Sequence, residues 1–277
     1  SLLDLIQELV EASPVPRERI RGIGVGVPAV VSYRDDAVVV WAPALGWRDE
    51  PLKHLLEDRL GIATFIENDV NLAALGESQF GIGRGVQNLV CISIGTGIGA
   101  GLILNGELYR GQEGAAGEVG YMIPTPDLLY RSSSEGFGAL ESLAAGPGVV
   151  SRTKEALSKG VRSALSNGTR EPDALTAKQV FQAARDGDAL AQEIVTQTVD
   201  YLAQAIADVA CTLNPEMIIL GGGLTRSDDL LLKPIQERVR RVVPFPPKIV
   251  LTQLGDAAVL RGAIALAIQA TREGISY

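Results

Sequence analysis

The chain has 277 residues, enough for two domains or one large one, and 33 acidic against 25 basic residues give it a formal net charge of −8. No cluster of Lys and Arg interrupts this acidic balance, so nucleic acid, whose phosphates require such residues, is not expected to bind here. The single histidine, His54, argues against a Ser-His-Asp triad and excludes a site with several histidine ligands.

The apolar residues indicate a cytoplasmic protein. Cys91 and Cys211 both stand in apolar runs and are expected to be buried, reduced thiols. No apolar run approaches the roughly 18 residues that a membrane span requires. We therefore expect cytoplasmic localisation and no membrane partner.

The first eighty residues alternate between helical and extended patterns. In chain order we predict a helix over 1–12, a buried strand and turn over 21–31, a short strand over 36–47, a helix over 52–61, a strand over 64–69 and a helix over 70–81. Two apolar runs over 88–110 then flank a glycine-rich turn, and the turn signal Asn105-Gly106 follows.

The second half is mostly helical. Residues 124–138 are expected to form a surface loop, 139–213 to be largely helical, and 151–175 to be a surface excursion before Thr176 caps the next helix. Residues 189–213 predict a long buried helix, 216–224 a strand, glycines and a helix, and 248–270 a strand, turn and helix. Alternating strands and helices predict an α/β fold, and the hairpin over 88–110 predicts a mixed sheet.

The stretch SIGTGIGAG carries Gly95, Thr96 and Gly97 between two predicted strands. A dinucleotide fingerprint or Walker loop would lie between a strand and a helix, so the position argues against both. Successive backbone N–H groups in such a turn can still bind phosphate oxygens, and a plain glycine hairpin is the alternative.

Three further groups could carry chemistry. In IENDV, the Asp69 carboxylate could act as a general base and Asn68 could bind a hydroxyl, whereas helix capping is the structural alternative. LGGGL puts Gly221, Gly222 and Gly223 between a strand and a helix whose N-terminus would attract anions, or simply in a tight turn. Glu118 and Glu141 lie near the polar loop, where isolated glutamates are usually solvated charges.

Six stretches follow one another along nearly the whole chain: GIGVGVPAVV, APALGW, IENDVNLAALGE, ISIGTGIGAGLILNGELYRGQEGAAGEVGYM, LNPEMIILGGGL and LGDAAVLRGAIALA. In this order they resemble the ROK family of sugar kinases and sugar-responsive repressors. The resemblance implies an actin-like (ribonuclease-H-like) sugar-kinase fold, with two lobes around a cleft, ATP on the larger lobe and a sugar between the lobes. The expected small lobe comprises residues 1–80 joined by the C-terminal helix 262–277, and the large lobe comprises 81–261.

The resemblance also assigns roles to individual residues. Asp69 matches the catalytic base that deprotonates the attacking sugar hydroxyl, and sugar ligands are matched by Asn68, Glu118 and Glu141. The second phosphate loop is matched by Gly95, Thr96 and Gly97, and the loop near the adenosine by Gly221, Gly222 and Gly223.

Several positions depart from the family pattern. Ala44 stands where sugar kinases of the family carry the Asn of P-N-L-G-W, Ala29 replaces a Gly, and Tyr121 replaces a His that touches both sugar and zinc. The three zinc cysteines are matched by Ser132, Ser134 and Ala139, and neutral hydroxyls are poor zinc ligands, so no structural zinc is expected. The family's N-terminal D-x-G-G-T phosphate loop does not occur in the sequence, so we expect the chain to be a fragment.

These departures favour one functional hypothesis over two others. They fit the sugar-binding effector domain of a ROK-type transcriptional regulator, in which kinase activity is dispensable and DNA is bound only through a domain outside this chain. The alternative is an ATP-dependent hexose kinase, for glucose or an N-acyl-hexosamine, that uses Asp69 as base and Mg²⁺-bound ATP. A third hypothesis is a degenerate binding or oligomerisation module, and the resemblance also implies a homodimer.

Overall fold

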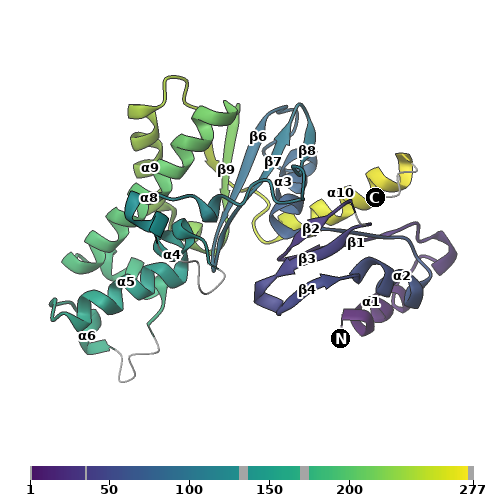
Figure 1. The fold of residues 1–277 in the computed structure, drawn as a ribbon, viewed down its shortest axis with the longest axis horizontal. Helices are drawn as coiled ribbons and strands as arrows, with labels where there is room; N and C mark the ends of the chain where they lie inside the picture. Colours follow the sequence, from purple (N-terminus) through teal and green to yellow (C-terminus); the bar gives the residue numbers. More distant parts are fainter. Residues whose placement is uncertain (1, 35, 131–136, 169–174, 274–277) are drawn as a thin grey trace. The chain divides into compact units, whose positions relative to one another are not determined.

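The computed structural model describes residues 2–34, 36–130, 137–168 and 175–273 (Figure 1). The chain forms two compact units. The first consists of residues 1–87, 101–117 and 253–277, and the second of 88–100 and 118–252. Each unit therefore draws on segments that are far apart in the sequence.

The first unit combines two small sheets with helices. Its elements are α1 (Leu2–Glu11), β1 (Ile23–Val27), β2 (Val30–Ser32), β3 (Val38–Ala42), β4 (Trp47–Glu50), α2 (Leu52–Leu60), β5 (Thr64–Asn68), α3 (Asp69–Phe80), β8 (Glu107–Tyr109) and α10 (Ala257–Glu273), with short 3-10 helices at Arg17–Arg19 and Pro43–Leu45. Strands β1 and β5 pair in parallel, with Val27 beside Asn68, whereas β2, β3 and β4 form an antiparallel sheet. The register of β1 and β5 brings the end of β1 to the start of α3.

Two glycines allow helices α3 and α10 to pack closely. A methyl group on Gly76 would lie 2.2 Å from the Ala258 carbonyl oxygen, and one on Gly262 would lie 1.8 Å from the Leu72 carbonyl oxygen. Both neighbours are backbone atoms, which cannot move aside as a flexible side chain can. Around this contact lies a core cluster that includes Phe65, Leu72, Leu75, Ala263, Leu266 and Ala270. This packing fixes the first turn of α3, where the candidate base lies.

The second unit is built on parallel strands with helices around them. Its elements are β6 (Leu89–Ile94), the first part of β7 (Ile98–Leu104), α4 (Ala139–Ala144), α5 (Gly146–Ser158), α6 (Leu165–Gly168), α7 (Ala177–Arg185), α8 (Ala189–Leu213), β9 (Met217–Gly221), α9 (Asp228–Val242) and β10 (Lys248–Leu251), with 3-10 helices at Val119–Tyr121, Pro126–Tyr130 and Gly223–Ser227. Strand β9 lies between β6 and β10 and is parallel to both. The strand order β10-β9-β6-β7-β8, with β7 and β8 antiparallel, makes the sheet mixed.

The predicted α/β fold with a mixed sheet is confirmed. The helices expected over 1–12, 52–61, 70–81 and 189–213 correspond to α1, α2, α3 and α8. Gly61 ends α2 in the left-handed conformation (φ 58°), which a residue without a Cβ adopts at low cost. Thr176 caps α7 in a reciprocal capping box with Gln179, as its position before an apolar pattern predicts.

The structure also corrects several local predictions. Strand β4 was not expected, because its residues, WRDE, are mostly polar and carry no alternating apolar signal. The excursion predicted over 151–175 is wrong at its start, since α5 continues to Ser158 and buries Thr153. A 3-10 helix intervenes between the Gly221–Gly223 turn and α9. Cys91 is buried as expected, but Cys211 is exposed.

Residues 81–87, 101–117 and 253–261 belong to the first compact unit, whereas the expectation from the sequence placed them in the large lobe. A methyl group on Gly101 would lie 2.6 Å from the Ala74 methyl and from the Val70 carbonyl oxygen, which shows how closely this segment packs against α3. The lobe boundaries expected from the sequence stay a prediction.

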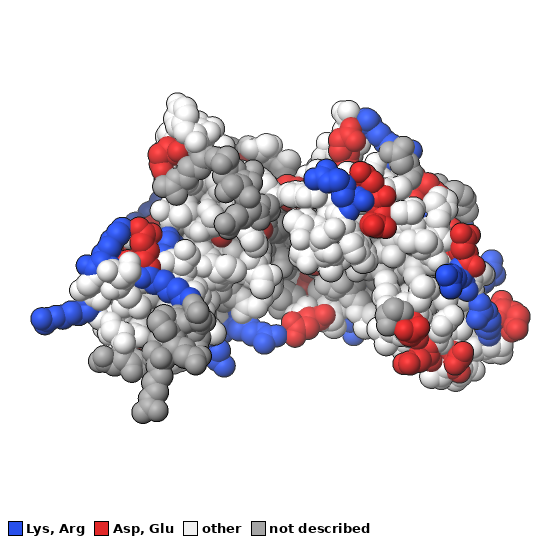
Figure 2. All heavy atoms as spheres, turned by 60° about the horizontal axis from the view of Figure 1, so that its bottom comes forward, with Lys and Arg blue, Asp and Glu red and all other residues white. Residues whose placement is uncertain are grey.

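Charged side chains on the face drawn in Figure 2 are scattered among uncharged ones, and both signs occur on the described residues. The net charge of −8 is therefore not gathered into one patch on this face. Within the described part of the chain, no helix has both the length and the apolar character needed to cross a membrane.

Candidate active site

Asn68 lies at the junction between β5 and α3 and caps the helix. Its Oδ1 accepts hydrogen bonds from the backbone N–H groups of Val70 (2.8 Å) and Asn71 (3.0 Å), which have no partner within the helix. Its Nδ2 donates to the Ala29 carbonyl oxygen at 3.1 Å. The capping alternative is thus correct for this residue. Because an amide nitrogen has two hydrogens, one donor of Asn68 is left for a ligand.

Asp69 is the first residue of α3 and is half-buried. Burial raises its pKa above the ordinary value of 3.8, an effect partly offset by the backbone N–H of Val70, which donates to Oδ1 at 2.9 Å. Among the described residues, no cation forms an ion pair with Asp69. An unneutralised carboxylate with a raised pKa is a better proton acceptor than a surface aspartate, so the geometry suits a general base.

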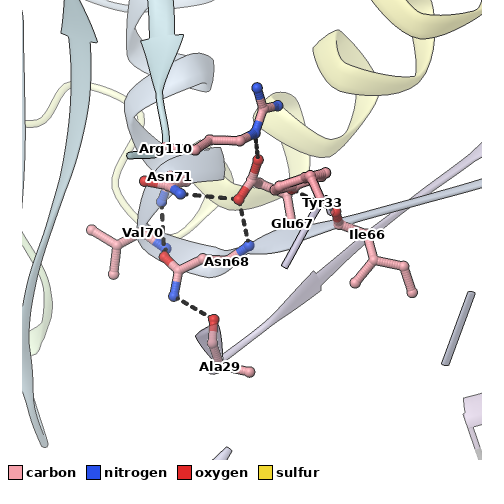
Figure 3. A network of polar contacts seen from close by, with 8 residues as sticks. All are labelled: Ala29, Tyr33, Ile66, Glu67, Asn68, Val70, Asn71 and Arg110. Atoms are coloured by element: carbon pink, nitrogen blue, oxygen red, sulfur yellow. Dashed lines mark hydrogen bonds and ion pairs between the residues drawn. The ribbon is translucent and has the colours of Figure 1, made fainter. Parts of the chain in front are cut away.

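A buried polar network lies directly beside this pair (Figure 3). The Glu67 side chain is 1% exposed and accepts from Arg110 Nε at 2.7 Å, from Asn71 Nδ2 at 2.9 Å and from the Asn68 backbone N–H at 2.9 Å. The Arg110 guanidinium lies 4.6 Å from the centre of the Tyr33 ring. No local sequence pattern indicates this network, because Glu67 and Arg110 are 43 positions apart.

The phosphate-loop candidates of the second unit lie together. The Gly95 carbonyl oxygen accepts from the N–H of Gly146, the first residue of α5, at 2.8 Å. A methyl group on Gly95 would lie 3.8 Å from the Gly223 nitrogen, so the two glycine turns are neighbours. Thr96 is exposed at the tip of its turn. Gly146 was also missed, although Gly-Pro-Gly at a helix start, with Pro147 in the first turn, was a usable signal.

The turn after β9 requires glycine. Gly222 has a φ of 87°, and a methyl group there would lie 2.5 Å from the Ile94 carbonyl oxygen and 2.6 Å from the Ile94 nitrogen. Thr225 Oγ1 donates to the Gly222 carbonyl oxygen at 2.8 Å and closes the turn. Because Ile94 directly precedes Gly95, this contact sets the second glycine turn against the first.

Glu141 is not a merely solvated charge. Its Oε1 accepts from the backbone N–H of Ile98 at 2.8 Å, and its Oε2 accepts from that of Gly138 at 2.9 Å, which joins the Gly95–Gly97 turn to the start of α4. Tyr121 is half-buried, and burial together with the charges of Glu141 and Glu118 raises its pKa to about 12. The Glu118 side chain is exposed. At neutral pH the Tyr121 phenol is therefore protonated and able to donate a hydrogen bond.

The model of the ROK family matches residues 1–270. The chain belongs to the ROK family. The glucokinase of Streptomyces coelicolor is 36% identical over 96% of this chain and 86% of its own length, and the xylose repressor of Caldicellulosiruptor bescii is 31% identical over 96% of this chain and 67% of its own.

Solved structures similar to this chain likewise include both ROK kinases and a ROK transcriptional regulator. A ROK family glucokinase from Streptomyces griseus, crystallised with glucose and AMPPNP, has a TM-score of 0.79 and 34% identity, covering 97% of this chain and 88% of that one. A ROK family transcriptional regulator, a homologue of the E. coli MLC protein, has a TM-score of 0.84 and 29% identity, covering 99% and 68%. The sugar-kinase fold is thus established. The glucokinases match over more of their own length and at higher identity, which favours the kinase alternative over the regulator hypothesis.

The ROK positions that depart from the pattern are partly visible. Ala44 is exposed in the Pro43–Leu45 turn, and its methyl group cannot hydrogen-bond a hydroxyl. Ala29 is buried, and its carbonyl oxygen holds Asn68. Ser132 and Ser134 lie outside the described residues, whereas Ala139 begins α4. Within the described ranges, no group of three His, Cys, Asp or Glu residues could hold a metal ion.

Proposed function

We propose that this chain is the kinase fold of an ATP-dependent hexose kinase of the ROK family, with glucose as the first candidate substrate. The observation that carries the proposal is Asp69: a half-buried carboxylate with a raised pKa, without an ion-pair partner among the described residues, at the start of a helix. The neighbouring Glu67 is neutralised by Arg110, whereas no cation among the described residues pairs with Asp69, which leaves the Asp69 carboxylate available as a proton acceptor. The names of the glucokinase relatives support the same activity.

In the proposed reaction, Asp69 accepts the proton of a hexose hydroxyl as its oxygen attacks the γ-phosphorus of ATP. The bond to the β–γ bridging oxygen breaks, ADP leaves, and the sugar phosphate is formed. In such transfers the base mainly orients the nucleophile, and positioning and electrostatic stabilisation supply most of the rate. The remaining donor of Asn68 would hold a neighbouring hydroxyl.

The nucleotide would bind to the glycine turns of the second unit. The backbone N–H groups of Gly95, Thr96 and Gly97 are proposed to bind phosphate oxygens, and Gly221, Gly222 and Gly223 to lie near the adenosine. Glycine allows a ligand to approach the backbone closely, and Gly146 begins α5 beside the first turn. A substitution that distorts these turns should therefore weaken ATP binding more than it weakens hexose binding.

Glu141, Glu118 and Tyr121 are proposed as further sugar ligands. Each Glu141 oxygen accepts one backbone hydrogen bond and so retains capacity for a sugar hydroxyl. The Tyr121 phenol is a donor at every physiological pH because its pKa is raised to about 12. With Ala44 unable to contribute, these groups would have to supply more of the hexose affinity than in an Asn-bearing kinase.

The experiment is a coupled assay of ADP release by the full-length protein with glucose, mannose and N-acetylated hexosamines. We expect turnover with at least one hexose, and a loss of about 100-fold or more in kcat for Asp69→Asn, in the range of a general-base contribution. The absence of turnover with every hexose, or a kcat unchanged by Asp69→Asn, would refute the kinase proposal.

A sugar-responsive regulator is the second candidate. It is favoured by the TM-score of 0.84 to the ROK regulator and by Ala44, which removes a hydroxyl ligand. For this function we expect hexose to raise the melting temperature without any ADP release, since a ligand of the native state stabilises it. A DNA-binding domain outside this chain remains a prediction of this candidate alone, whereas the homodimer and the cytoplasmic localisation remain predictions for both candidates.

A further inference from the structure

The Glu67–Arg110 pair lies directly beside the candidate base, Asp69. Glu67 accepts a hydrogen bond from the backbone N–H of Asn68, the residue before Asp69. We propose that this pair is a positioning device: it sets the Asn68–Asp69 junction in the orientation that binds the hexose and accepts its proton. The inference rests on the proposed function for its kinetic consequences, while its effect on hexose binding can be measured separately.

Glu67 is tied to two segments besides its own strand. One of its oxygens, Oε1, accepts from the Asn68 backbone N–H and from Asn71 Nδ2, both at 2.9 Å, and the other accepts from Arg110 Nε at 2.7 Å. The three donors come from the end of β5, the first turn of α3 and the residue after β8 (Figure 3). One carboxylate therefore fixes the point where strand becomes helix against a separate part of the chain.

Asn68 is held in a single orientation by contacts on its backbone and on its side chain. Its backbone N–H is held by Glu67, its Oδ1 by two backbone N–H groups of α3, and its Nδ2 by the Ala29 carbonyl oxygen. Asp69 follows by one peptide bond, so the same contacts hold the backbone from which its side chain projects, and the Val70 N–H donates to its Oδ1 at 2.9 Å. The free donor of Asn68 and the Asp69 carboxylate are thus placed together rather than independently.

Arg110 is itself held from a second side. Its guanidinium lies over the Tyr33 ring, and the Tyr33 hydroxyl donates to the Ile66 carbonyl oxygen at 2.9 Å, one residue before Glu67. Burial alone would lower the Arg110 pKa, but the Glu67 charge and Tyr33 raise it, so the guanidinium is charged at every working pH. The pair is therefore not lost through deprotonation of its cation.

Glutamine cannot replace Glu67 in this network. If its amide oxygen accepted from Asn68 and Asn71, its NH₂ group would face Arg110 Nε, donor against donor. If the amide were reversed, the Asn68 N–H would lose its acceptor. Within the described residues, Asn71 Oδ1 is already a buried atom without a hydrogen-bond partner, because Asn71 turns its NH₂ toward Glu67. The orientation of the Asn71 amide thus gives Glu67 a hydrogen bond and leaves Asn71 Oδ1 without one among the described residues.

A purely structural role predicts a different result from a positioning role. Replacing both members of a buried ion pair by uncharged residues is often neutral for stability, whereas removing one member leaves an unpaired buried charge. The double variant Glu67→Leu/Arg110→Met removes both buried charges together with the acceptor of the Asn68 N–H, and should therefore fold better than Glu67→Gln alone, which leaves the Arg110 charge unpaired. If the pair positions Asp69, activity does not recover with stability.

The experiment compares wild type, Glu67→Gln, the double variant and a matched control, Glu77→Gln, in the full-length protein. Glu77 lies on α3, the helix that begins with Asp69, and is fully buried. It accepts hydrogen bonds from the backbone N–H groups of Ile82 (3.0 Å) and Leu254 (3.2 Å). It stands eight residues beyond Asp69, about 12 Å along the helix. The control therefore carries the same chemical change at a buried carboxylate away from the site.

The measurements are melting temperature, kcat, KM for ATP, and the hexose dissociation constant by calorimetry. We expect kcat of the double variant to fall about 100-fold, the penalty typical of a displacement near 1 Å, with KM for ATP within about twofold. In the double variant hexose binding should weaken at least about tenfold. Glu77→Gln should change neither kcat nor the affinity for hexose.

Wild-type kcat and hexose affinity in the double variant would overturn the positioning role. If wild type binds hexose without turnover, the kinase proposal fails, and hexose affinity alone decides between the variants. If wild type binds no hexose, both proposals fail.

Discussion

Replacing Gly222 by alanine is expected to destabilise the second unit and to weaken ATP binding, because its methyl group has no room. The new Cβ would lie 2.5 to 2.7 Å from the nitrogen, carbonyl carbon and carbonyl oxygen of Ile94. These are backbone atoms of a buried strand, β6, that pairs with β9. In addition, the φ of 87° is one that residues with a Cβ rarely adopt.

The two costs can be estimated separately. The left-handed backbone conformation costs about 1–3 kcal/mol for a residue other than glycine. Overpacking of a tight contact costs about 1–3 kcal/mol more. The sum, about 2–6 kcal/mol, is a large share of the 5–15 kcal/mol that typically stabilises a domain, and it corresponds to a fall of about 5–20 °C in melting temperature.

The neighbouring residue provides the control. A methyl group on Gly223 would meet no atom within 4 Å, so Gly223→Ala should melt within about 2 °C of wild type, as surface substitutions do. Circular dichroism melting curves measure the stability of both variants, and KM for ATP reports the displacement of the adjoining Gly95 turn. If Gly222→Ala melts no lower than Gly223→Ala, the steric argument is wrong.

Three other substitutions test the candidate site. Because the folded state raises the Asp69 pKa above 3.8, it holds this proton more tightly than the unfolded chain, and stability falls as pH rises through the interval above 3.8. Asp69→Asn should therefore gain melting temperature relative to wild type between pH 4 and pH 7, even as kcat falls; a constant difference would contradict this. Ala44→Asn should lower KM for hexose about tenfold by adding a hydrogen-bond partner, and an unchanged KM would exclude that position from the sugar site. Tyr121→Phe should raise KM for hexose about tenfold, by the same amount at pH 6 and pH 9, because the pKa near 12 keeps the phenol protonated throughout; a loss that grows or vanishes between these pH values would contradict this.

The sequence alone determined what depends on neighbours along the chain. The period of apolar residues located α1, α2, α3 and α8, and the residue types at helix starts located the caps of α3 at Asn68 and of α7 at Thr176. These features are local because a helix forms its hydrogen bonds between residues four apart. The order of six motifs along the chain, the Asn68-Asp69 pair and the glycine-rich stretches among them, indicated the ROK family from sequence alone.

Local sequence pattern did not predict an element that is held by pairing with a neighbouring strand rather than by its own apolar periodicity. Strand β4 is polar and is held by its register with β3, in which Trp41 faces Arg48, so its own sequence carries little strand signal. The functional hypothesis was affected in the same way. Substitutions at Ala44 and Tyr121 suggested a lost activity, whereas the kinases match at higher identity and over more of their own length.

Only the tertiary structure decided which groups serve the candidate base and the glycine turns. Arg110 reaches Glu67, and Glu141 reaches Ile98, each across 43 positions of sequence. Such pairs depend on how strands register and helices cross, which no periodicity in one segment encodes. Asp69 was therefore recognisable from its motif, but the carboxylate beside it, which we infer to set its direction, became visible only when β5, α3 and the residue after β8 were seen to meet.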